Sequence, residues 1–503
     1  MSRDQPGSPP HVRVAVVGAG FAGLGAAVAL EREGIEYTVL ERSADVGGTW
    51  RDNHYPGCRC DVPSHLYSFS FEPNPDWTET YSPQPELFAY LRQTAEKYGV
   101  VKHIRFDHEV MHAAWDADAR HWRIETSAGL LTADIMMLGN GPLAEPAIPD
   151  IPGLDTFEGT TFHSARWRHD HDLGGERVGV IGTGASAIQF VPEIQPLVDK
   201  LSLFQRTPPW VLPHPNRRIT ALERRLYRRV PVLQRLVRTG VYWSREIFAG
   251  FLVYNPPVLR VLERAIAAYI GMRIRDPQLR EKLIPKYRPG CKRLLLSNNY
   301  YPAIQRDNVE VVSDAIIEVR PHGVVTAGGV EHPVDTIIFG TGFHVTDNPI
   351  AEKVQGADGR TLGEHWSASG AQAYLGTAVP GFPNFFLLAG PNTGIGHTSL
   401  VYMIEAQIRY VIDGLRQMGE RGVDSVEVRQ TAWQRWSDDV QRKAARTVWN
   451  SGGCASWYLD AEGRNTTLWP GYTFAFSERA RRFDMVSYEC AAGIVDMESR
   501  GAG

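Results

Sequence analysis

The sequence has few cysteines, five among 503 residues, and they are scattered and odd in number (Cys58, Cys60, Cys291, Cys454 and Cys490). This usage argues against a disulfide framework and suits the reducing cytoplasm, where we expect the protein to be located. A net charge of −4 provides no general basic field, so nucleic acid is not an expected partner. The chain also has no internal repeat and no low-complexity tract, and we expect no metal site.

One apolar stretch near the N-terminus could be mistaken for a signal peptide or a membrane span. Residues 14–30 are nearly all apolar, but Gly18, Gly20 and Gly23 interrupt them. These glycines follow a β-branched run and open a segment rich in alanine and leucine. That order is typical of a strand, a tight turn and a helix, and it predicts a globular segment.

The same stretch carries a complete dinucleotide fingerprint. A predicted strand at 12–17 leads into the three glycines, and a second β-type run at 37–40 ends at Glu41. Gly18 would permit the tight turn, Gly20 would let the backbone approach a pyrophosphate, and Gly23 would allow close packing of the helix on the strand. Glu41 stands where a carboxylate would accept hydrogen bonds from a ribose diol.

A second fingerprint lies further along the chain. It follows a predicted strand at 178–181 and consists of Gly182, Thr183, Gly184, Ala185, Ser186 and Ala187. The next predicted strand, 201–204, ends in Arg206 and Thr207 where an acidic residue would repel a 2′-phosphate. Arginine would bind that phosphate through a charge-assisted contact, so NADPH is favoured over NADH. An exposed arginine without a ligand is the alternative.

Between the fingerprints, residues 157–167 have the spacing FxGxxxHxxxW, with Phe157, Gly159, His163 and Trp167 at the fixed positions. Flanked by two dinucleotide sites, this pattern resembles the signature of the class B, or type I, flavin-dependent Baeyer–Villiger monooxygenases. The resemblance implies that this segment connects domains and responds to the nicotinamide cofactor. Arg168 departs from the Pro or Asp that often follows the tryptophan, which weakens any placement in a subfamily.

A further stretch, 47–61, resembles the family pattern GGxWx4[FY]PGxxxD. Without that context it would be a Gly/Pro-rich surface loop with an exposed aspartate. The resemblance implies that FAD is contacted around this loop and at two later positions, and that Arg59 contacts NADPH. The residues so implied for FAD are Gly48, Thr49, Trp50, Asp61, Val62, Tyr67 and Val110. Cys58 and Cys60 form CxC, which lacks the spacing of a flavin disulfide reductase, and we expect both to be inert.

The pair Lys292-Arg293 also stands where the family has a Lys-Arg pair. By resemblance, Lys292 would bind the 2′-phosphate, and Arg293 would contact NADPH and lie at the flavin face as a catalytic residue with Asp61. A permanently charged guanidinium stabilises an anion without giving up a proton. The alternative is an ordinary surface pair. Trp457 lies in a stretch that resembles a mobile loop closing over the nicotinamide, and it fits a core aromatic equally well.

The resemblance covers nearly the whole chain and implies an α/β fold with two Rossmann-like domains. The length of 503 residues supports two or three domains. The proportions of hydrophobic residues, 43%, and of charged residues, 22%, are ordinary for a globular protein. We expect FAD on 1–141 and 343–503, NADPH on 152–210 and 290–338, and a helical insertion at 211–289. The insertion is basic and amphipathic, which could suit an anionic membrane surface, but we expect a solvated basic face.

The expected function is an NADPH- and O2-dependent monooxygenase that converts a ketone into an ester or lactone through a C4a-peroxyflavin. Three alternatives remain. A flavin N- or S-oxygenase shares both fingerprints; a pyridine-nucleotide disulfide reductase would need paired redox cysteines, which are not evident; and a non-oxygenating flavin redox protein would bind FAD without turning over a ketone. A small ketone and O2 are the expected partners, and nothing in the chain requires a protein partner or a membrane.

Overall fold

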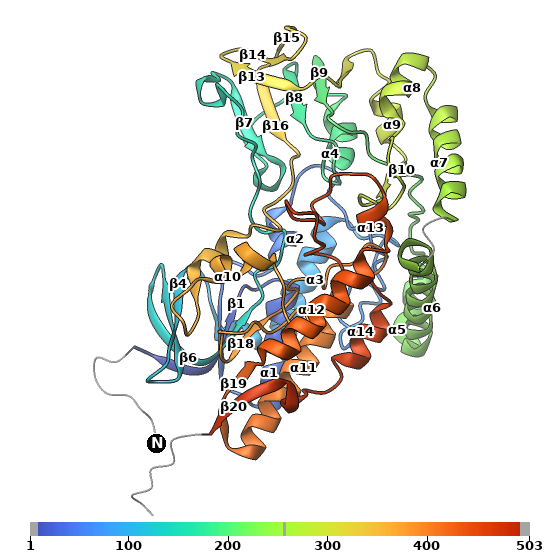
Figure 1. Cartoon of the computed structure of the whole chain (residues 1–503). Coiled ribbons are helices and arrows are strands. Elements are labelled where there is room, and N and C mark those ends of the chain that lie inside the picture. Colours follow the sequence, from blue (N-terminus) through green and yellow to red (C-terminus); the bar gives the residue numbers. More distant parts are fainter. Residues whose placement is uncertain (1–8, 255–257, 493–503) are drawn as a thin grey trace, which may run out of the picture.

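The computed structural model describes residues 9–254 and 258–492. Two sheets, each built around parallel strands that carry one fingerprint, form separate units stacked along the long axis of the molecule (Figure 1). The first lies in the lower half of the view and the second at the top. This arrangement confirms the predicted α/β class with two Rossmann-like sheets.

The first sheet is centred on β1 (His11–Val17), whose apolar residues are buried against helices on one side and a β-meander on the other. β1 pairs in parallel with β2 and with β6, as a nucleotide-binding sheet requires. The strand order is β17-β4-β5-β6-β1-β2-β3, and β18 pairs with the end of β6. The other bounds are β2 (Tyr37–Leu40), β3 (Ile104–Arg105), β4 (Val110–Asp116), β5 (His121–Thr126), β6 (Gly129–Leu138), β17 (Val354–Gln355) and β18 (Phe385–Leu387).

The second sheet is entirely parallel and has the order β12-β9-β8-β16-β7. Its strands are mostly buried, as expected for a parallel sheet covered on both faces. A three-stranded antiparallel sheet covers one side (Figure 1). The bounds are β7 (Thr160–His163), β8 (Arg177–Ile181), β9 (Lys200–Phe204), β12 (Val309–Val312), β16 (Thr336–Phe339), and, in the small sheet, β13 (Ile316–Arg320), β14 (Gly323–Thr326) and β15 (Glu331–Pro333).

Helices cover the first sheet on the side away from its meander. The fingerprint helix α1 packs against α11, whose 22 residues bury one long face. α1 ends at Gly34, which adopts φ 65° and caps the helix. The helices of this unit are α1 (Phe21–Glu33), α2 (Thr49–Asp52), α3 (Gln84–Lys97), α10 (Leu362–Ser369), α11 (Leu400–Arg421), α12 (Gln430–Ala444), α13 (Val448–Ser451) and α14 (Thr473–Arg479). A two-stranded ribbon, β19 (Val423–Val428) and β20 (Tyr488–Ala492), lies beside them.

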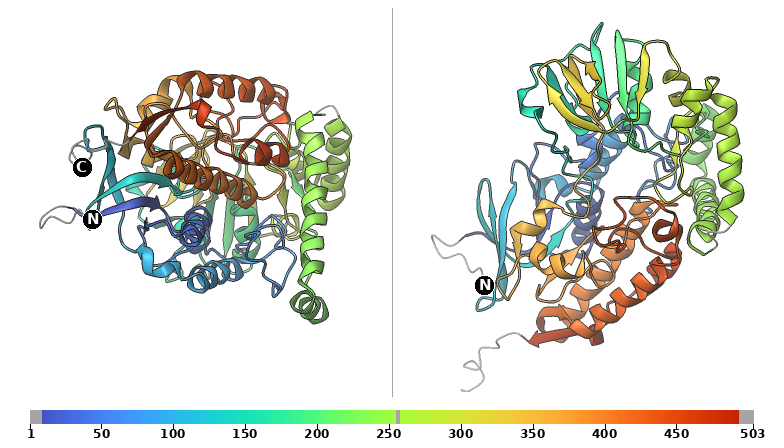
Figure 2. Two further views of the ribbon diagram at one scale, coloured as in Figure 1. Left: turned by 90° about the horizontal axis from the view of Figure 1, so that it is seen from below. Right: turned by 45° about the horizontal axis from the view of Figure 1, so that its top comes forward.

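The expected insertion is helical, and it lies along one edge of the molecule (Figures 1 and 2). Its helices are α5 (Ala221–Arg229), α6 (Pro231–Ala249), α7 (Leu259–Arg273) and α8 (Pro277–Leu283). α5 begins at a capping box formed by Thr220 and Glu223. The second unit also contains α4 (Ala187–Ile194), α9 (Tyr300–Ala303) and the short pair β10 (Val211–Leu212) and β11 (Leu295–Leu296).

Candidate functional site

A cavity of about 430 Å³ opens at the carboxyl end of β1, where the first fingerprint predicts a dinucleotide. Most residues expected to contact FAD line it: Gly18, Gly20, Glu41, Gly48, Thr49, Trp50, Tyr67 and Val110. Within the lining, the Trp50 indole N–H donates to the Tyr67 hydroxyl at 3.2 Å. Gly23, Asp61 and Val62 do not line this cavity.

The glycines leave room for a pyrophosphate in this cavity. Gly18 adopts φ 93°, and a Cβ there would come within 2.9 Å of the Gly139 carbonyl oxygen. A Cβ on Gly48 would lie 3.1 Å from Gly20 Cα, so side chains at these two positions would fill the gap between them. Gly23 has the packing role expected of a third glycine, since its Cβ would collide with the Gly18 carbonyl. The residues therefore fit a dinucleotide.

Glu41 follows β2, as predicted, and the structure shows that it is buried. Its Oε2 accepts from the Ala19 amide at 2.8 Å, and its Oε1 accepts from Ser43 at 3.0 Å. Arg51 Nη1 lies 3.0 Å from Oε1. No motif predicts this ion pair, because nothing in the spacing links Arg51 to Glu41. The pair fixes the carboxylate in the wall of the cavity where a ribose would bind.

The second fingerprint has the same local geometry. Gly182 adopts φ 108°, and a Cβ there would approach the Gly340 carbonyl oxygen to 2.4 Å. Ala187, which replaces the third glycine, is fully buried at the start of α4. Gly184 and Ala185 are exposed at the turn, with Ser186 following, so their backbone is accessible to a ligand. The Thr183 hydroxyl donates to the Thr207 carbonyl at 3.3 Å and joins this turn to the end of β9.

Two cations converge beyond β9. Burial lowers the pKa of Lys292, and the positive charge of Arg206 lowers it further, so the two side chains are close enough to repel each other. The Lys292 ammonium also lies 5.4 Å from the centre of the Tyr287 ring. Like charges held together in this way form a site suited to a dianion such as a 2′-phosphate.

Arg293 and Asp61 form a bidentate ion pair. Nη2 donates to Oδ1 at 2.7 Å and Nε to Oδ2 at 2.5 Å, and each side chain is only about a quarter exposed (29% and 25%). Burial is the largest single influence on the pKa of Asp61 and would raise it. The charge of Arg293 and the hydrogen bonds to the carboxylate together outweigh burial and hold the pKa below its ordinary value. The Asp61 carboxylate in turn raises the pKa of Arg293, so the guanidinium stays charged.

This pair lies next to the first cavity. Tyr67 lines the cavity, and its ionisation responds to the charges of both Asp61 and Arg293, although burial is the main reason that its pKa is raised. Asp61 comes from the loop after α2, and Arg293 comes from the segment before β11. The structure thus brings together, across 232 positions, the two residues predicted to be catalytic.

Arg59 lies where the loop after α2 meets the second unit. Its amide donates to Gln189 Oε1 at 3.2 Å, and Gln189 Nε2 donates back to the Arg59 carbonyl at 3.1 Å. The Tyr55 hydroxyl donates to the same Gln189 oxygen. The Arg59 guanidinium pairs with Glu79 at 3.0 Å. Gln189 therefore joins the two units, a role that no motif indicated.

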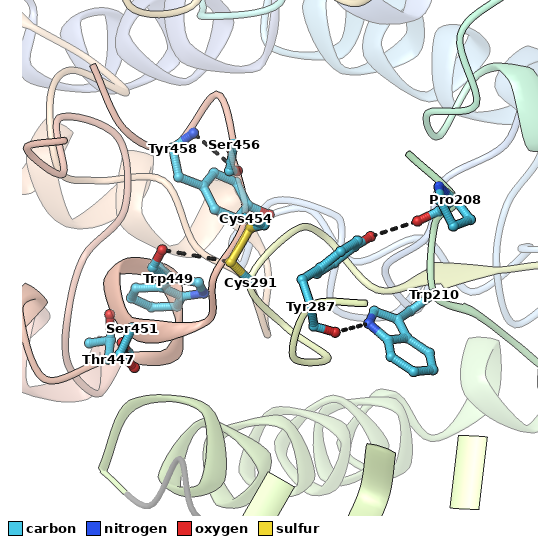
Figure 3. Close-up of a disulfide and its surroundings, with 10 residues drawn as sticks. All are labelled: Pro208, Trp210, Tyr287, Cys291, Thr447, Trp449, Ser451, Cys454, Ser456 and Tyr458. Atoms are coloured by element: carbon cyan, nitrogen blue, oxygen red, sulfur yellow. Dashed lines mark hydrogen bonds between the residues drawn. A yellow bond between two sulfur atoms is a disulfide. The ribbon is translucent and has the colours of Figure 1, made fainter. Parts of the chain in front are cut away.

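A disulfide joins Cys291 to Cys454, with a sulfur–sulfur distance of 2.01 Å (Figure 3). The number and spacing of the cysteines argued against a disulfide framework, and the structure nevertheless contains this one bond. The bond spans 163 positions, a separation that carries no sequence signal. It connects the segment that carries Lys292 and Arg293 to the loop that carries Trp457.

Two neighbouring aromatic residues in the loop after the disulfide, Trp457 and Tyr458, differ in their exposure to solvent. Trp457 is 45% exposed, so the alternative that it is a core aromatic is wrong. Its neighbour Tyr458 is buried and lies 4.5 Å from it between ring centres. Burial raises the pKa of Tyr458 to about 12, against the opposing charge of Arg293 close by. Tyr458 thus belongs to the environment of Arg293, and the sequence did not predict this.

The signature residues lie on and around β7, the edge strand of the second sheet. Gly159 allows the start of β7 to lie close to the chain entering β16, because a Cβ there would lie 2.1 Å from the Asp335 carbonyl oxygen. Phe157 packs beside it. His163 is buried, its Nδ1 accepts from the Ala165 amide, and burial lowers its pKa to about 4. Its ring meets Phe343 edge to face on the chain returning to the first unit. Trp167 packs on Phe162 and Phe190.

Cys58 and Cys60 are buried free thiols, and burial raises the pKa of Cys58 to about 12, which fits the expected inertness. Among residues 9–254 and 258–492, no cluster of three or more His, Cys, Asp or Glu could hold a metal ion. In the same part of the chain, no helix is both long and apolar enough to cross a membrane.

Known proteins resemble this chain over nearly its whole length. A family model described as flavin-binding monooxygenase-like matches residues 11–242. A Baeyer–Villiger monooxygenase of Streptomyces coelicolor is 55% identical, over 95% of this chain and 92% of that protein. One of Pseudomonas aeruginosa is 49% identical, over 96% and 92%. The crystal structure of OTEMO in complex with FAD and NADP is similar with a TM-score of 0.86, at 30% identity over 96% of this chain and 100% of that one.

Proposed function

The chain belongs to the flavin-dependent Baeyer–Villiger monooxygenases, and we propose that it inserts one oxygen atom of O2 beside the carbonyl carbon of a ketone, giving an ester or lactone. It is an FAD- and NADPH-dependent, oxygen-inserting enzyme, as predicted. The part that we propose is the substrate class, a ketone. The observation that supports it is the bidentate Arg293–Asp61 pair beside the first cavity.

The pair suits a reaction in which negative charge develops on oxygen. Arg293 keeps its positive charge, because the neighbouring carboxylate raises its already high pKa. It can therefore stabilise an anion throughout the reaction without donating a proton. Asp61 fixes the direction of the guanidinium through two hydrogen bonds. A guanidinium oriented in advance loses little free energy to reorganisation when the charge forms.

The cofactor sites follow from the two fingerprints. We propose that FAD binds in the cavity at β1, with its pyrophosphate over Gly18 and Gly20 and a ribose at Glu41. When bound, FAD would accept a hydride from NADPH and activate O2. We propose that NADPH binds at the turn after β8, with its 2′-phosphate between Arg206 and Lys292. We assign contacts with NADPH to Trp457, which is exposed on the loop beyond the disulfide, and to Arg59, which lies where the two units meet.

We keep the domain limits as part of the proposal. FAD is assigned to 1–141 and 343–503, NADPH to 152–210 and 290–338, and the insertion to 211–289. NADPH dependence favours the cytoplasm as the location of the enzyme. Small molecules suffice as partners, and the proposed reaction needs no protein partner.

The alternatives differ in what the site must supply. A flavin N- or S-oxygenase needs a proton at the reacting oxygen, and a guanidinium that stays charged does not deliver one. A disulfide reductase needs its cysteine pair at the flavin, and neither Cys291 nor Cys454 lines the cavity at β1. A non-oxygenating redox protein would oxidise NADPH without forming any oxygenated product.

A competition assay separates these functions. FAD-loaded protein would receive NADPH and O2 with equal amounts of a cyclic ketone and a thioether, and the products would be quantified per NADPH consumed. We expect ester or lactone to predominate. Sulfoxide as the main product would establish the heteroatom oxygenase instead. Hydrogen peroxide as the sole product across a broad ketone panel would contradict oxygenation of either kind.

A further inference from the structure

The outer face of α6 carries an apolar stripe. Val232, Leu236, Trp243 and Ile247 are 58%, 61%, 50% and 66% exposed. At 3.6 residues per turn, these positions fall within an arc of about 60° at the centre of the exposed side. An amphipathic helix of a soluble protein normally turns such a stripe toward the core. Here the core contacts of α6 come from its other side, where Gln234 and Tyr242 pack.

Both neighbouring helices have the same pattern. On α5, Leu222 and Leu226 stand one turn apart and are exposed. On α7, Val261 and Met272 are 70% and 77% exposed and lie within about 20° of each other around the helix axis. We call the exposed apolar residues of the three helices the insertion face: Leu222, Leu226, Val232, Leu236, Trp243, Ile247, Val261 and Met272. The helices lie along one edge of the molecule in every view (Figures 1 and 2).

Aromatic residues extend the insertion face at one end. The Trp243 ring lies 5.8 Å from that of Phe474, which is 40% exposed at the start of α14. Tyr254, beyond the end of α6, is also exposed, and the centre of its ring lies 4.9 Å from that of Tyr472. Tryptophan and tyrosine side chains, whose polar ends can remain in water, are enriched where proteins meet the interfacial region of a bilayer.

Arginines surround this apolar face. Residues 211–289 contain 17 Arg or Lys and 5 Asp or Glu, a net charge of +12, whereas the whole chain has −4; the remainder therefore carries −16. On α5, Arg225 and Arg229 alternate with the leucines, and on α6 and α7 Arg235 and Arg264 flank the stripes. Within the described residues, none of these four arginines pairs with a carboxylate.

We propose that the insertion face docks on the surface of an anionic lipid bilayer. The apolar side chains would enter the boundary between headgroups and acyl chains, and the arginines would contact phosphate groups, as in helices that lie in the membrane plane. Such binding needs no spanning helix. It differs from the solvated basic face that the sequence favoured, because the apolar residues are exposed together with the arginines.

Other occupants fit less well. A second copy meeting the same face would bring two +12 segments together, and their repulsion opposes a symmetric contact. Nucleic acid would use the arginines but leave the leucines, Trp243 and Ile247 exposed to water. The proposal is independent of the ketone assignment, since it concerns a surface separate from the Arg293–Asp61 site.

Vesicle binding by the FAD-loaded full chain tests the proposal. Sedimentation would compare vesicles of phosphatidylcholine with vesicles containing about one third phosphatidylglycerol. We expect binding to the anionic vesicles that weakens with salt, and at least about tenfold weaker binding to neutral ones. The variants Leu236→Ser with Trp243→Ser, and Arg225→Glu with Arg229→Glu, should each lower binding at least about tenfold.

The matched control is Met111→Ser with Val330→Ser, which removes two comparably exposed apolar side chains (50% and 53%) elsewhere. It should bind vesicles like the parent, and all variants should keep the parental melting temperature. Binding to neither vesicle would overturn the proposal. So would light scattering that shows a dimer in the absence of lipid and a monomer for Leu236→Ser with Trp243→Ser.

Discussion

Arg293 donates two hydrogen bonds to Asp61, and the residues belong to the two units that carry the NADPH and FAD fingerprints. The ion pair therefore joins the two units, and in the proposed function it lies where FAD and NADPH would meet. A bidentate geometry fixes the plane of the guanidinium as well as its position. The relationship makes the orientation of Arg293 dependent on Asp61.

Replacing Asp61 by Asn should leave Arg293 charged but less firmly oriented. We expect kcat for ketone oxygenation to fall about tenfold or more, with KM for NADPH nearly unchanged, because the loss affects charge stabilisation rather than cofactor binding. Steady-state kinetics with Asp61→Glu as the charge-preserving control would measure this. An Asp61→Asn enzyme as fast as the parent would show that the carboxylate has no positioning role.

Arg206 should account for much of the preference for NADPH. A hydrogen bond to a charged group contributes about 1.5–3 kcal/mol, so Arg206→Ala should raise KM for NADPH roughly 10- to 100-fold while KM for NADH changes little. Removing Arg206 also removes the repulsion that helps to lower the pKa of Lys292. The control is Arg123→Ala, an exposed arginine on β5. An equal rise in KM for NADPH and for NADH in Arg206→Ala would contradict a contact with the 2′-phosphate.

The disulfide should stabilise the fold measurably. By the chain-entropy relation, a crosslink across 163 positions contributes on the order of 5 kcal/mol. Cys291→Ser, or reduction by dithiothreitol, should therefore lower the melting temperature by several degrees. The exposed thiol Cys490 supplies the control, since Cys490→Ser should melt like the parent in both conditions. If dithiothreitol leaves the parent's melting temperature unchanged, the crosslink adds nothing to stability.

Acid should destabilise the protein through its buried histidines. Burial lowers the pKa of His65, His163 and His214 to about 4. Between about pH 6.5 and 4 the unfolded chain binds protons that the folded chain does not. The free energy of unfolding therefore decreases as the pH is lowered, by at most about 1.4 kcal/mol per pH unit for each histidine. Urea unfolding at several pH values should show this slope. His163→Gln should reduce the slope, and an unchanged slope would mean that His163 is protonated in the fold.

The local patterns could be predicted because short-range physical constraints determine them. The strand–turn–helix units at Gly18 and Gly182 need glycines and β-branched runs at fixed spacing, and β2 has the predicted limits. Long-range contacts had no such signal. The Cys291–Cys454 bond and the Gln189 link between units depend on how distant segments pack, and periodicity does not encode that.

The insertion face likewise depends on long-range packing that the sequence patterns do not predict. The composition of 211–289 indicated basic amphipathic helices, and α5, α6 and α7 confirm the helices. Which side of each helix faces the core depends on its tertiary neighbours. Only the structure shows that Leu236 and Trp243 are exposed, and that Tyr458 lies beside Arg293.

The most direct test of the central claim is isotope incorporation with and without the guanidinium. The FAD-loaded enzyme and Arg293→Ala would each convert a cyclic ketone under ¹⁸O₂ with NADPH, and mass spectrometry would follow the product. We predict one ¹⁸O atom in the lactone formed by the parent and, for Arg293→Ala, NADPH oxidation with lactone formation reduced at least about a hundredfold. Labelled lactone formed by Arg293→Ala at the parental rate would contradict the account.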